Sequence, residues 1–585
     1  MVGKVALFKT QLDGDNQAKQ LSSLYDTWWR QRNVKEAEWR ELRNYLFATD
    51  TTKTTNSSLP WKNTTTIPKL TQIRDNLHAN YMDALFPNDD WLRWEGFSSD
   101  DVVQKKRRAI EAYMKNKLRE SGFRETISKL LHDYIDYGNV FAEVEWVNEK
   151  HVDPVTQEEI TTYIGPKVFR ISPFDLVFNP VAPSFSESPK FVRYLMNVGE
   201  LEDYLTKSGN VWNAQALTKV KTLRKSLSSF KMEDVNKSEA YLIDGFGSLF
   251  EYYQSGLVEV LVFSGDYYDE TADQLKKRRI VTIVDRQYVV QDIEDPSWFG
   301  EDNKVNTCWR ERPDNLYGMG PLDNLVGMQY RVDHLENLKA DALDQTILPP
   351  KVIVGDVEPF EWGPGVNIHV SEDGDVRTLP PDPMAFQVNN EIAGLLQLME
   401  EMAGAPKEAM GIRTPGEKTA FEVQQLQNAA GRIFQNKVNK FEIEFLEKVL
   451  NKMLEVARRK MSVPDLVKVM DDDLGVVDFM EVSKDDLTGK GKLRPIGARH
   501  YAARAQLMQN VVGVFNGPIG QMIMPHVSPL SMAKMVEEYM GFERFKIIRE
   551  NAAIAEQTQT QRMINEAQST LQTEASAPVE EKLLG

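Results

Sequence analysis

The longest helical pattern in the sequence runs from residue 420 to residue 460, and it constrains the fold more than any other feature. Apolar residues recur there at every third or fourth position, between charged and amide residues: Val423, Leu426, Ile433, Phe441, Phe445, Val449 and Val456. A pattern of about forty residues is far longer than the average globular helix of about 10–14 residues. We therefore expect an architecture organised by long helices.

Two shorter helical segments and a small β segment precede this pattern. Pro321 can open a helix at its first position, and the pattern continues to about Ile347, where two prolines end it. The stretch 350–381 combines β-forming residues with many Gly and Pro, and 388–404 is helical in pattern again. The predicted order is helix, compact β segment, helix, glycine-rich loop and very long helix.

The rest of the sequence alternates between helical and strand patterns. Apolar spacing predicts four helices near the N-terminus, at 16–47, 67–85, 101–121 and 123–138. β-Forming residues predict strands at 140–146 and 163–172 and an antiparallel region at 239–310. The pattern is mainly helical at 463–550, and the polar tail from Asn551 suits a helix with few partners or a disordered segment. The expected fold class is α+β and predominantly helical.

The composition limits how this chain can meet nucleic acid and membranes. Its 585 residues, enough for several domains, carry a formal charge of -17. Because neutralising phosphates requires Lys and Arg, we expect no general nucleic-acid coat protein, although a small basic element can still touch DNA. The single cysteine, Cys308, excludes a disulfide within the chain and a thiolate cluster, and it suits a buried structural thiol. Without a run of 18 apolar residues or a signal-peptide core, we expect a soluble protein with no membrane span.

The segment GIRTPGEKT, residues 411–419, resembles a phosphate-binding loop but departs from that pattern. In the Walker A motif a Lys follows the second Gly directly, whereas here Glu417 stands between them. The segment also joins two helical patterns instead of a strand and a helix, which disfavours an ATPase. We expect a mobile loop with two groups of functional residues: hinges at Gly404, Gly411, Pro415 and Gly416, and positive charge from Lys407, Arg413 and Lys418.

Motifs that carry catalysis are missing from the sequence. The seven histidines are scattered without an H-E-x-x-H motif, and there is no G-x-S-x-G motif. The carboxylate clusters SEDGD (371–375) and MDDDLG (470–475) lack the terminal Glu of a calcium loop, so turns and caps explain them better. Two KKRR runs, at 105–108 and 276–279, are typical of solvated faces. We expect no enzyme, no catalytic residue, no metal and no cofactor.

Three segments, taken in their order, resemble one protein family. NLHANYMDALFPNDDWLRW (76–94) is similar to a family segment that ends in an LFP…W stretch. RERPDNLYGMGPLDNLVGMQYRVDHLENLKADALDQTILPPKVIVGD (310–356) resembles a YGxGP helix that runs into a Pro-marked β segment. GKLRPIGARHYAARAQLMQNVV (491–512) resembles the module that follows the long helix. The family is that of bacteriophage portal proteins, the head-to-tail connectors of short-tailed phages, and the resemblance covers roughly residues 15–550.

The resemblance implies regions called wing, stem, clip and crown. They would be a wing at 1–320, stem helices at 321–347 and 386–404, a clip at 348–385, a tunnel loop at 405–419, a long wing-to-crown helix at 420–462, a crown at 463–550, and a C-terminal barrel or disordered tail at 551–585. It further implies a ring, usually of twelve subunits, at one capsid vertex of the virion. DNA would pass through this ring during packaging and ejection.

The resemblance also implies partners and a location. The partners would be further copies of the chain, the major capsid protein, the terminase large subunit, a head-tail adaptor and the double-stranded DNA in the channel, with no membrane involved. The chain would be assembled in the host cytoplasm and reside at the portal vertex of the virion.

Within such a ring, the tunnel loop would line the narrowest part of the channel. Lys407, Arg413 and Lys418 would supply weak contacts to the phosphate backbone, because many phosphate contacts would stall a sliding duplex. The stem helices would pack against neighbouring subunits, so part of their apolar face would be exposed in a single chain. Two alternatives stay open: a helical structural virion protein such as a scaffold or tail component, and a P-loop-like ATPase subunit.

Overall fold

The structure is a computed structural model. It describes residues 5–8, 14–60, 62–87, 91–96, 101–152, 159–197, 199–202, 258–269, 273–298, 302–355, 374–378, 387–403, 433–468 and 479–496. The chain divides into two units, 1–495 and 496–585, and every helix and strand named below lies in the first unit. Of the described residues, 48% are helical and 31% lie in strands. The prediction of a predominantly helical protein is therefore wrong, because antiparallel sheets built from residues 139–319 take up much of the first unit.

Four helices form near the N-terminus where the apolar spacing predicts them. Their bounds are α1 Gly14–Phe47, α2 Lys69–Leu85, α3 Asp101–Glu120 and α4 Phe123–Asp136. Two short turns of 3-10 helix lie between α1 and α2, η1 at Thr51–Lys53 and η2 at Thr55–Ser58. Gly122 separates α3 from α4 with φ 65°, in the left-handed region that glycine adopts without steric penalty. The predicted break at this glycine is confirmed.

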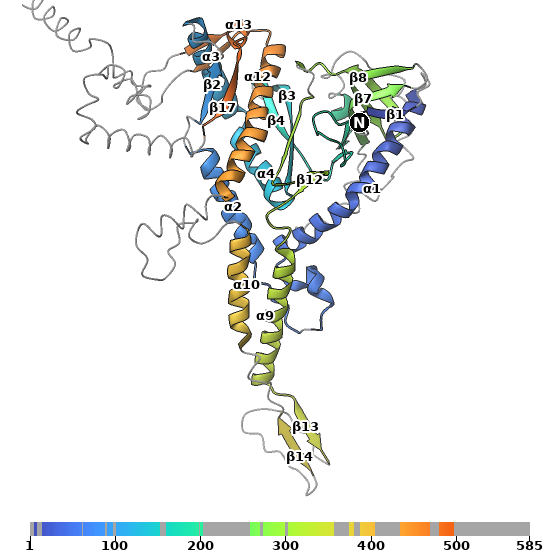
Figure 1. Cartoon of the computed structure of the whole chain (residues 1–585), viewed down its shortest axis with the longest axis vertical. Coiled ribbons are helices and arrows are strands. Elements are labelled where there is room, and N and C mark those ends of the chain that lie inside the picture. Colours follow the sequence, from blue (N-terminus) through green and yellow to red (C-terminus); the bar gives the residue numbers. More distant parts are fainter. Residues whose placement is uncertain are drawn as a thin grey trace, which may run out of the picture. The chain divides into compact units, whose positions relative to one another are not determined.

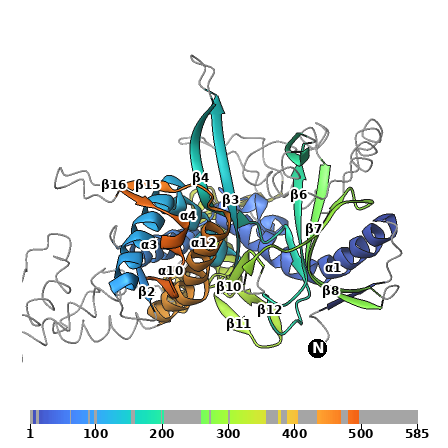
Figure 2. The same cartoon turned by 90° about the horizontal axis from the view of Figure 1, so that it is seen from above.

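Two antiparallel sheets follow these helices in the chain. The smaller has the order β10-β3-β4, with β3 Asn139–Val152, β4 Glu159–Ile171 and β10 Lys304–Cys308. The larger has the order β5-β6-β7-β8-β9, with β5 Leu176–Phe178, β6 Lys190–Met196, β7 Val258–Asp269, β8 Gln274–Val284 and β9 Tyr288–Glu294. Strand β1, Val5–Phe8, pairs with β7 in parallel. Figure 2 shows β3 and β4 as a long ribbon beside the strands of the larger sheet. The strands predicted at 140–146 and 163–172 are confirmed.

Four two-stranded ladders complete the described sheets. They pair β11 Arg310–Arg312 with β12 Asn315–Met319, β13 Lys351–Val354 with β14 Asp375–Thr378, β15 Asp465–Lys468 with β16 Phe479–Val482, and β2 Leu92–Gly96 with β17 Gly491–Pro495. A single turn of helix, α13 at Lys484–Leu487, precedes β17. The β2–β17 ladder ties the end of the first unit to its N-terminal helices.

The largest hydrophobic core joins the N-terminal helices to residues near position 450. It contains Tyr81, Trp94 and Tyr134 from the N-terminal part and Phe441 and Met453 from the C-terminal part, all essentially inaccessible to solvent. Tyr134 and Phe441 meet edge to face, with ring centroids 5.0 Å apart. Segments more than 300 residues apart in sequence are therefore held by one core.

The sequence YGMGP at 317–321 contains the end of strand β12 and not the start of a helix at Pro321. Gly318 lies in β12 against β10, where an added Cβ would come within 2.5 Å of the Cβ of Cys308. The backbone of Gly320 meets Gly138 so closely that a Cβ on Gly138 would lie 2.2 Å from the Gly320 nitrogen. These glycines permit close backbone packing, and the following helix begins at Val326 instead of Pro321.

The long helical pattern near the C-terminal side is helical wherever the structure describes it. Residues 433–441 are α-helical, Glu442–Leu446 form a π turn, and α12 continues from Glu447 to Lys460. The π turn holds one more residue per turn than an α-helix, so it shifts the apolar stripe that follows it. Residues 420–432 of the predicted helix lie outside the described residues.

Candidate functional site

Two helices lie side by side and carry a β hairpin at their far end (Figure 1). Helix α9 spans Val326–Ile347 and α10 spans Val388–Met402, and the hairpin is the β13–β14 ladder. Val332 on α9 and Ile392 on α10 are buried in the same hydrophobic cluster. We call α9, α10 and this hairpin the two-helix projection. Its order of helix, β segment and helix agrees with the sequence prediction.

An ion pair anchors α10 to the N-terminal helices. Lys69, at the start of α2, donates to the carboxylate of Glu400 near the end of α10 and also to the side-chain oxygen of Gln72. Both charged residues are buried, so each neutralises a charge that would otherwise be costly away from water. This contact fixes the end of α10 against α2.

Large apolar side chains are exposed along the outer sides of the projection. Ile347 is 75% exposed and Leu348 68%, at the end of α9. Further exposed apolar residues are Tyr330, Leu338 and Leu343 on α9, Leu398 and Met402 on α10, and Val352, Ile353 and Val354 on β13. An isolated two-stranded hairpin is only marginally stable in water, and contiguous exposed apolar surface marks interaction sites. The projection therefore has the surface of an element that packs against another molecule.

One glycine on each helix leaves the backbone there uncovered by other atoms of the chain. A Cβ added to Gly327 on α9 or to Gly394 on α10 would meet no atom within 4 Å. Glycine in a helix interior, as at Gly394, costs about 1 kcal/mol relative to alanine, and among the described residues no close contact requires it there. On α10, Gly394 lies one and two turns before Leu398 and Met402, so the three share one outer side. A neighbouring molecule can approach the backbone closely at this side.

A polar segment lies along α9 on the side away from α10 (Figure 1). We call residues 50–67 the strap. Asn337 of α9 accepts from the backbone N–H of Thr65 at 2.8 Å and donates to the Thr65 carbonyl at 2.7 Å. One turn earlier, Asp333 accepts from the backbone N–H of Ile67 at 3.1 Å, and Gln329 donates to the Ile67 carbonyl at 2.6 Å. The strap is thus held mainly through its backbone.

Two acidic residues extend this ladder toward the hairpin. Asp341 accepts from the backbone N–H of both Lys62 and Asn63, at 3.2 and 3.1 Å. The Asn63 amide donates to Asp341 at 2.8 Å and to Asp344 at 2.9 Å. Spacings of four and three residues place all the ladder side chains on one side of α9.

Asp333 is the buried centre of the ladder. Burial raises the pKa of its carboxyl to about 6, although the bonds from Ile67, Thr66 and Gln329 act in the opposite direction. The nearby phenol of Tyr45 on α1 has its own pKa raised, mainly by burial. The strap is therefore docked through a carboxylate whose charge is poorly solvated.

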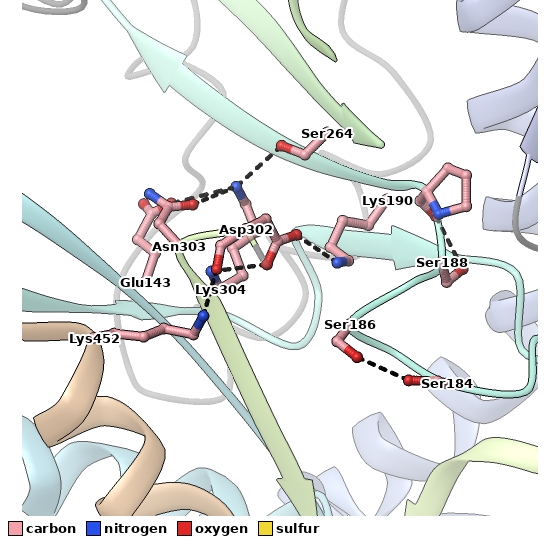
Figure 3. Close-up of polar contacts among 11 residues, drawn as sticks. Glu143, Ser184, Ser186, Ser188, Lys190, Ser264, Asp302, Asn303, Lys304 and Lys452 are labelled. Atoms are coloured by element: carbon pink, nitrogen blue, oxygen red, sulfur yellow. Dashed lines mark hydrogen bonds and ion pairs between the residues drawn. The ribbon is translucent and has the colours of Figure 1, made fainter. Parts of the chain in front are cut away.

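A second polar cluster joins the two larger sheets (Figure 3). Lys190 of β6 donates to Asp302 at 2.5 Å, and Lys304 of β10 donates to Ser264 of β7 at 3.1 Å. Lys452 of α12 donates to the backbone carbonyl of Asp302 at 2.6 Å. We call these residues the charged joint, because they connect β6, β7, β10 and α12.

The charged joint serves structure and not chemistry. Lys190 is 0% exposed, so no substrate can reach its ammonium without a large rearrangement. Burial lowers the pKa of Lys190, and Asp302 opposes that shift. For Asp302, burial acts to raise the pKa, but Lys190 and Lys304 outweigh it and hold the pKa below its ordinary value. A lysine with a lowered pKa often marks an active site, but here both charges are enclosed and paired.

The predicted loop residues lie outside the described residues. These are Gly404, Lys407, Gly411, Arg413, Pro415, Gly416 and Lys418. The structure describes the chain up to Ala403 and again from Ile433. Sequence analysis missed the strap, although a signal exists: between Thr51 and Arg74 the sequence has no Asp or Glu and many Thr, Ser and Asn.

The two KKRR runs are engaged within the chain. In the first, Lys106 donates to the carbonyl of Asp485, and Arg107 pairs with Glu111 at 3.1 Å. In the second, Arg279 pairs with Asp292 at 2.7 Å. These contacts explain the runs without nucleic acid.

Cys308 is partly buried, and two of the histidines stack on each other. Burial raises the pKa of Cys308, as expected for a structural thiol. His78 and His132 stack with centroids 3.9 Å apart, a contact that their sequence spacing does not indicate. In the part of the chain that the structure describes, no three His, Cys, Asp or Glu residues gather as metal ligands. Among the helices whose placement is described, none is both long and apolar enough to cross a bilayer.

Comparison with protein-family models finds no family that matches this chain, and comparison with curated proteins finds no match either.

Proposed function

We propose that this chain is a phage portal protein, a subunit of a ring at one capsid vertex through which double-stranded DNA is packaged and ejected. The observation that carries the proposal is the two-helix projection, which has apolar residues on both outer sides and a hairpin at its end. A surface of this kind is incompletely buried in one chain. Packing against further copies would bury it.

The two outer sides of the projection favour a ring over a symmetric dimer. One side presents Tyr330 and Leu338 of α9, and the other presents Leu398 and Met402 of α10. A contact between two different surfaces is heterologous, and repeated heterologous contacts form a ring when the rotation closes. In the family that the sequence resembles, the ring usually has twelve subunits.

Within this proposal, regions of the chain take distinct roles. The hairpin and the rest of 348–385 would dock the terminase large subunit during packaging and the head-tail adaptor afterwards. Residues 405–419, which follow α10, would form the tunnel loop around the DNA. The net charge of -17 suits a channel whose walls do not hold a duplex tightly. The major capsid protein would surround the ring at the vertex of the virion.

Electron microscopy of the purified full chain tests the proposal. We expect rings with a central hole, and sedimentation at the mass of a closed oligomer. Replacing both Leu398 and Met402 with Lys should yield smaller species, because two charges would be placed at the apolar contact. Val34→Lys on α1 is the matched control, since Val34 is an exposed apolar residue far from the projection in sequence. Particles that remain single chains at high concentration would contradict the proposal, and open rods would favour a scaffold or tail component.

A further inference from the structure

We propose that the strap is a subunit contact, and that its lysines Lys53 and Lys62 face the acidic outer side of α10 in the next copy of this chain. The inference rests on the proposed ring and specifies which surfaces meet in it. Four observations support it: the charge of the strap, the charge of α10, the position of each relative to α9, and the apolar residues beside them.

The strap is a cationic segment in an acidic protein. Its one carboxylate, Asp50, accepts from the N–H of Thr52 at 2.9 Å and so caps η1. After Asp50 the strap carries no Asp or Glu, and the side chains of Lys53 and Lys62 are exposed. Because the strap is held through its backbone, these lysines are free of the task of docking it to α9. The exposed face of the strap thus presents these two lysines and hydroxyl groups, while Asp341 and Asp344 of α9 contact Asn63 of the strap.

The outer side of α10 has the opposite charge. Between Val388 and Met402 there is no Lys or Arg, and both Glu391 and Glu401 are exposed. The third carboxylate of the helix, Glu400, is buried against Lys69 on the inner side. Glu391 lies close in helical phase to Gly394 and Leu398, so acidic and apolar residues share one outer surface.

The two charged surfaces lie on opposite sides of one chain and cannot neutralise each other within it. α9 stands between them, with the strap on one side and α10 on the other (Figure 1). Beside the strap, α9 exposes Tyr330 and Leu338, which correspond to the apolar Leu398 and Met402 on α10. Opposite charges and apolar groups would thus meet when one copy is related to the next by rotation about the ring axis. This complementarity identifies a second copy as the occupant of both surfaces.

Charge reversal tests the contact in the full chain. The variant K53E/K62E should need at least about tenfold more protein for half-maximal ring formation, because like charges would then meet at the contact. E391K/E401K should show the same loss. Combining all four substitutions should restore assembly to within about threefold of the original chain, since the charges are exchanged and not removed. Raising the salt concentration should weaken the original contact and the restored contact alike.

The control is K19E/R30E, which makes the same change in net charge at two exposed positions of α1. It should assemble like the original chain, and circular dichroism should show that every variant is folded. If K53E/K62E forms rings at the same protein concentration as the original chain, the strap contact is overturned while the proposed function stays intact. Failure of the fourfold variant to recover would overturn the pairing with α10. If the original chain forms no ring, the proposed function and this inference both fail.

Discussion

Asn337 and Thr65 form a closed pair of hydrogen bonds, in which one side-chain amide satisfies both the N–H and the carbonyl of one backbone residue. The distances are 2.8 Å for the bond that Asn337 accepts and 2.7 Å for the bond that it donates. An Asn side chain here replaces the neighbouring strand that would satisfy the same groups in a sheet. The strap can therefore run extended along a helix.

Asn337→Ala should loosen the strap without unfolding the chain. Two backbone groups would lose their partners, at a cost of roughly 1–3 kcal/mol. Hydrogen exchange at Thr65 should accelerate by about tenfold to a hundredfold, which mass spectrometry of peptides from 60–70 can measure. Gln345→Ala, at an exposed position of the same helix, should leave the rate unchanged. Equal rates in Asn337→Ala and the unmodified chain would show that this pair does not hold the strap.

The contribution of Asp333 to the stability of the fold should fall as the pH rises. The pKa of Asp333 is about 6 in the folded chain, above its ordinary value of 3.8, because burial disfavours its charge. Its contribution to the free energy of unfolding is therefore fully present below pH 4 and is lost as the pH rises through 6. The free energy of unfolding, measured with urea, should be larger at pH 5 than at pH 7.5 by the contribution of this group. Asp333→Asn should remove most of this difference, and an unchanged pH profile in that variant would rule out Asp333 as its source.

Asp302→Asn should destabilise the first unit strongly. The substitution would leave the ammonium group of Lys190 buried without its carboxylate partner, at a cost of roughly 3–5 kcal/mol. Thermal unfolding should shift to lower temperature by several degrees. Asp314→Asn, at an exposed position, should shift it little. Adding Lys190→Met to Asp302→Asn should recover part of the loss, and a full-strength loss in the double variant would contradict the assigned pairing.

Gly394→Leu should impair ring assembly without lowering the stability of the chain. Helix propensity favours Leu over Gly by up to about 1 kcal/mol, and a Cβ at this position has no atom within 4 Å. The variant should unfold at the same or a higher temperature, yet form rings poorly because its side chain would fill the space for a neighbour. Ala393→Leu, exposed on another side of α10, should assemble normally. Normal ring formation by Gly394→Leu would show that this side of α10 is not part of the subunit contact.

Neutralising the charges of the tunnel loop should reduce the DNA content of assembled particles and should not change the binding of nucleotide. Replacing Lys407, Arg413 and Lys418 with Ala should reduce the amount of DNA that assembled particles package or retain, because the weak phosphate contacts would be lost. Lys418→Ala alone should leave any ATP binding by the purified chain unchanged. Particles with full DNA content in the triple variant would refute the role of the loop, and loss of ATP hydrolysis in Lys418→Ala would restore the ATPase alternative.

Local patterns predicted several elements well because their cause is local. The helices α1 to α4 follow from apolar spacing, and the break at Gly122 follows from backbone freedom. The overall balance of helix and strand was misjudged because long antiparallel strands depend on partners distant in sequence, as β6 does on β7. The role of YGMGP was also misjudged, since the glycines serve contacts with Gly138 and Cys308 that no local pattern indicates.

The candidate site was predictable only in outline. The order of helix, hairpin and helix is visible in prolines and periodicity, so the projection could be expected. The place where the strap docks could not be predicted, because its hydrogen bonds join Asn63 and Thr65 to side chains more than 270 residues away. The charged joint likewise depends on Lys190 and Asp302, which only the sheet topology brings together.

The π turn at Glu442–Leu446 acts as a permanent one-residue insertion in the helix that ends at Lys460. Each residue of an α-helix advances the side-chain direction by about 100°. If the turn became ordinary α-helix without losing a residue, everything after it would rotate by that angle. Lys452 would swing away from Asp302, and Met453 would leave the core. The direction in which the side chains of the last helical segment point is therefore set by a local irregularity.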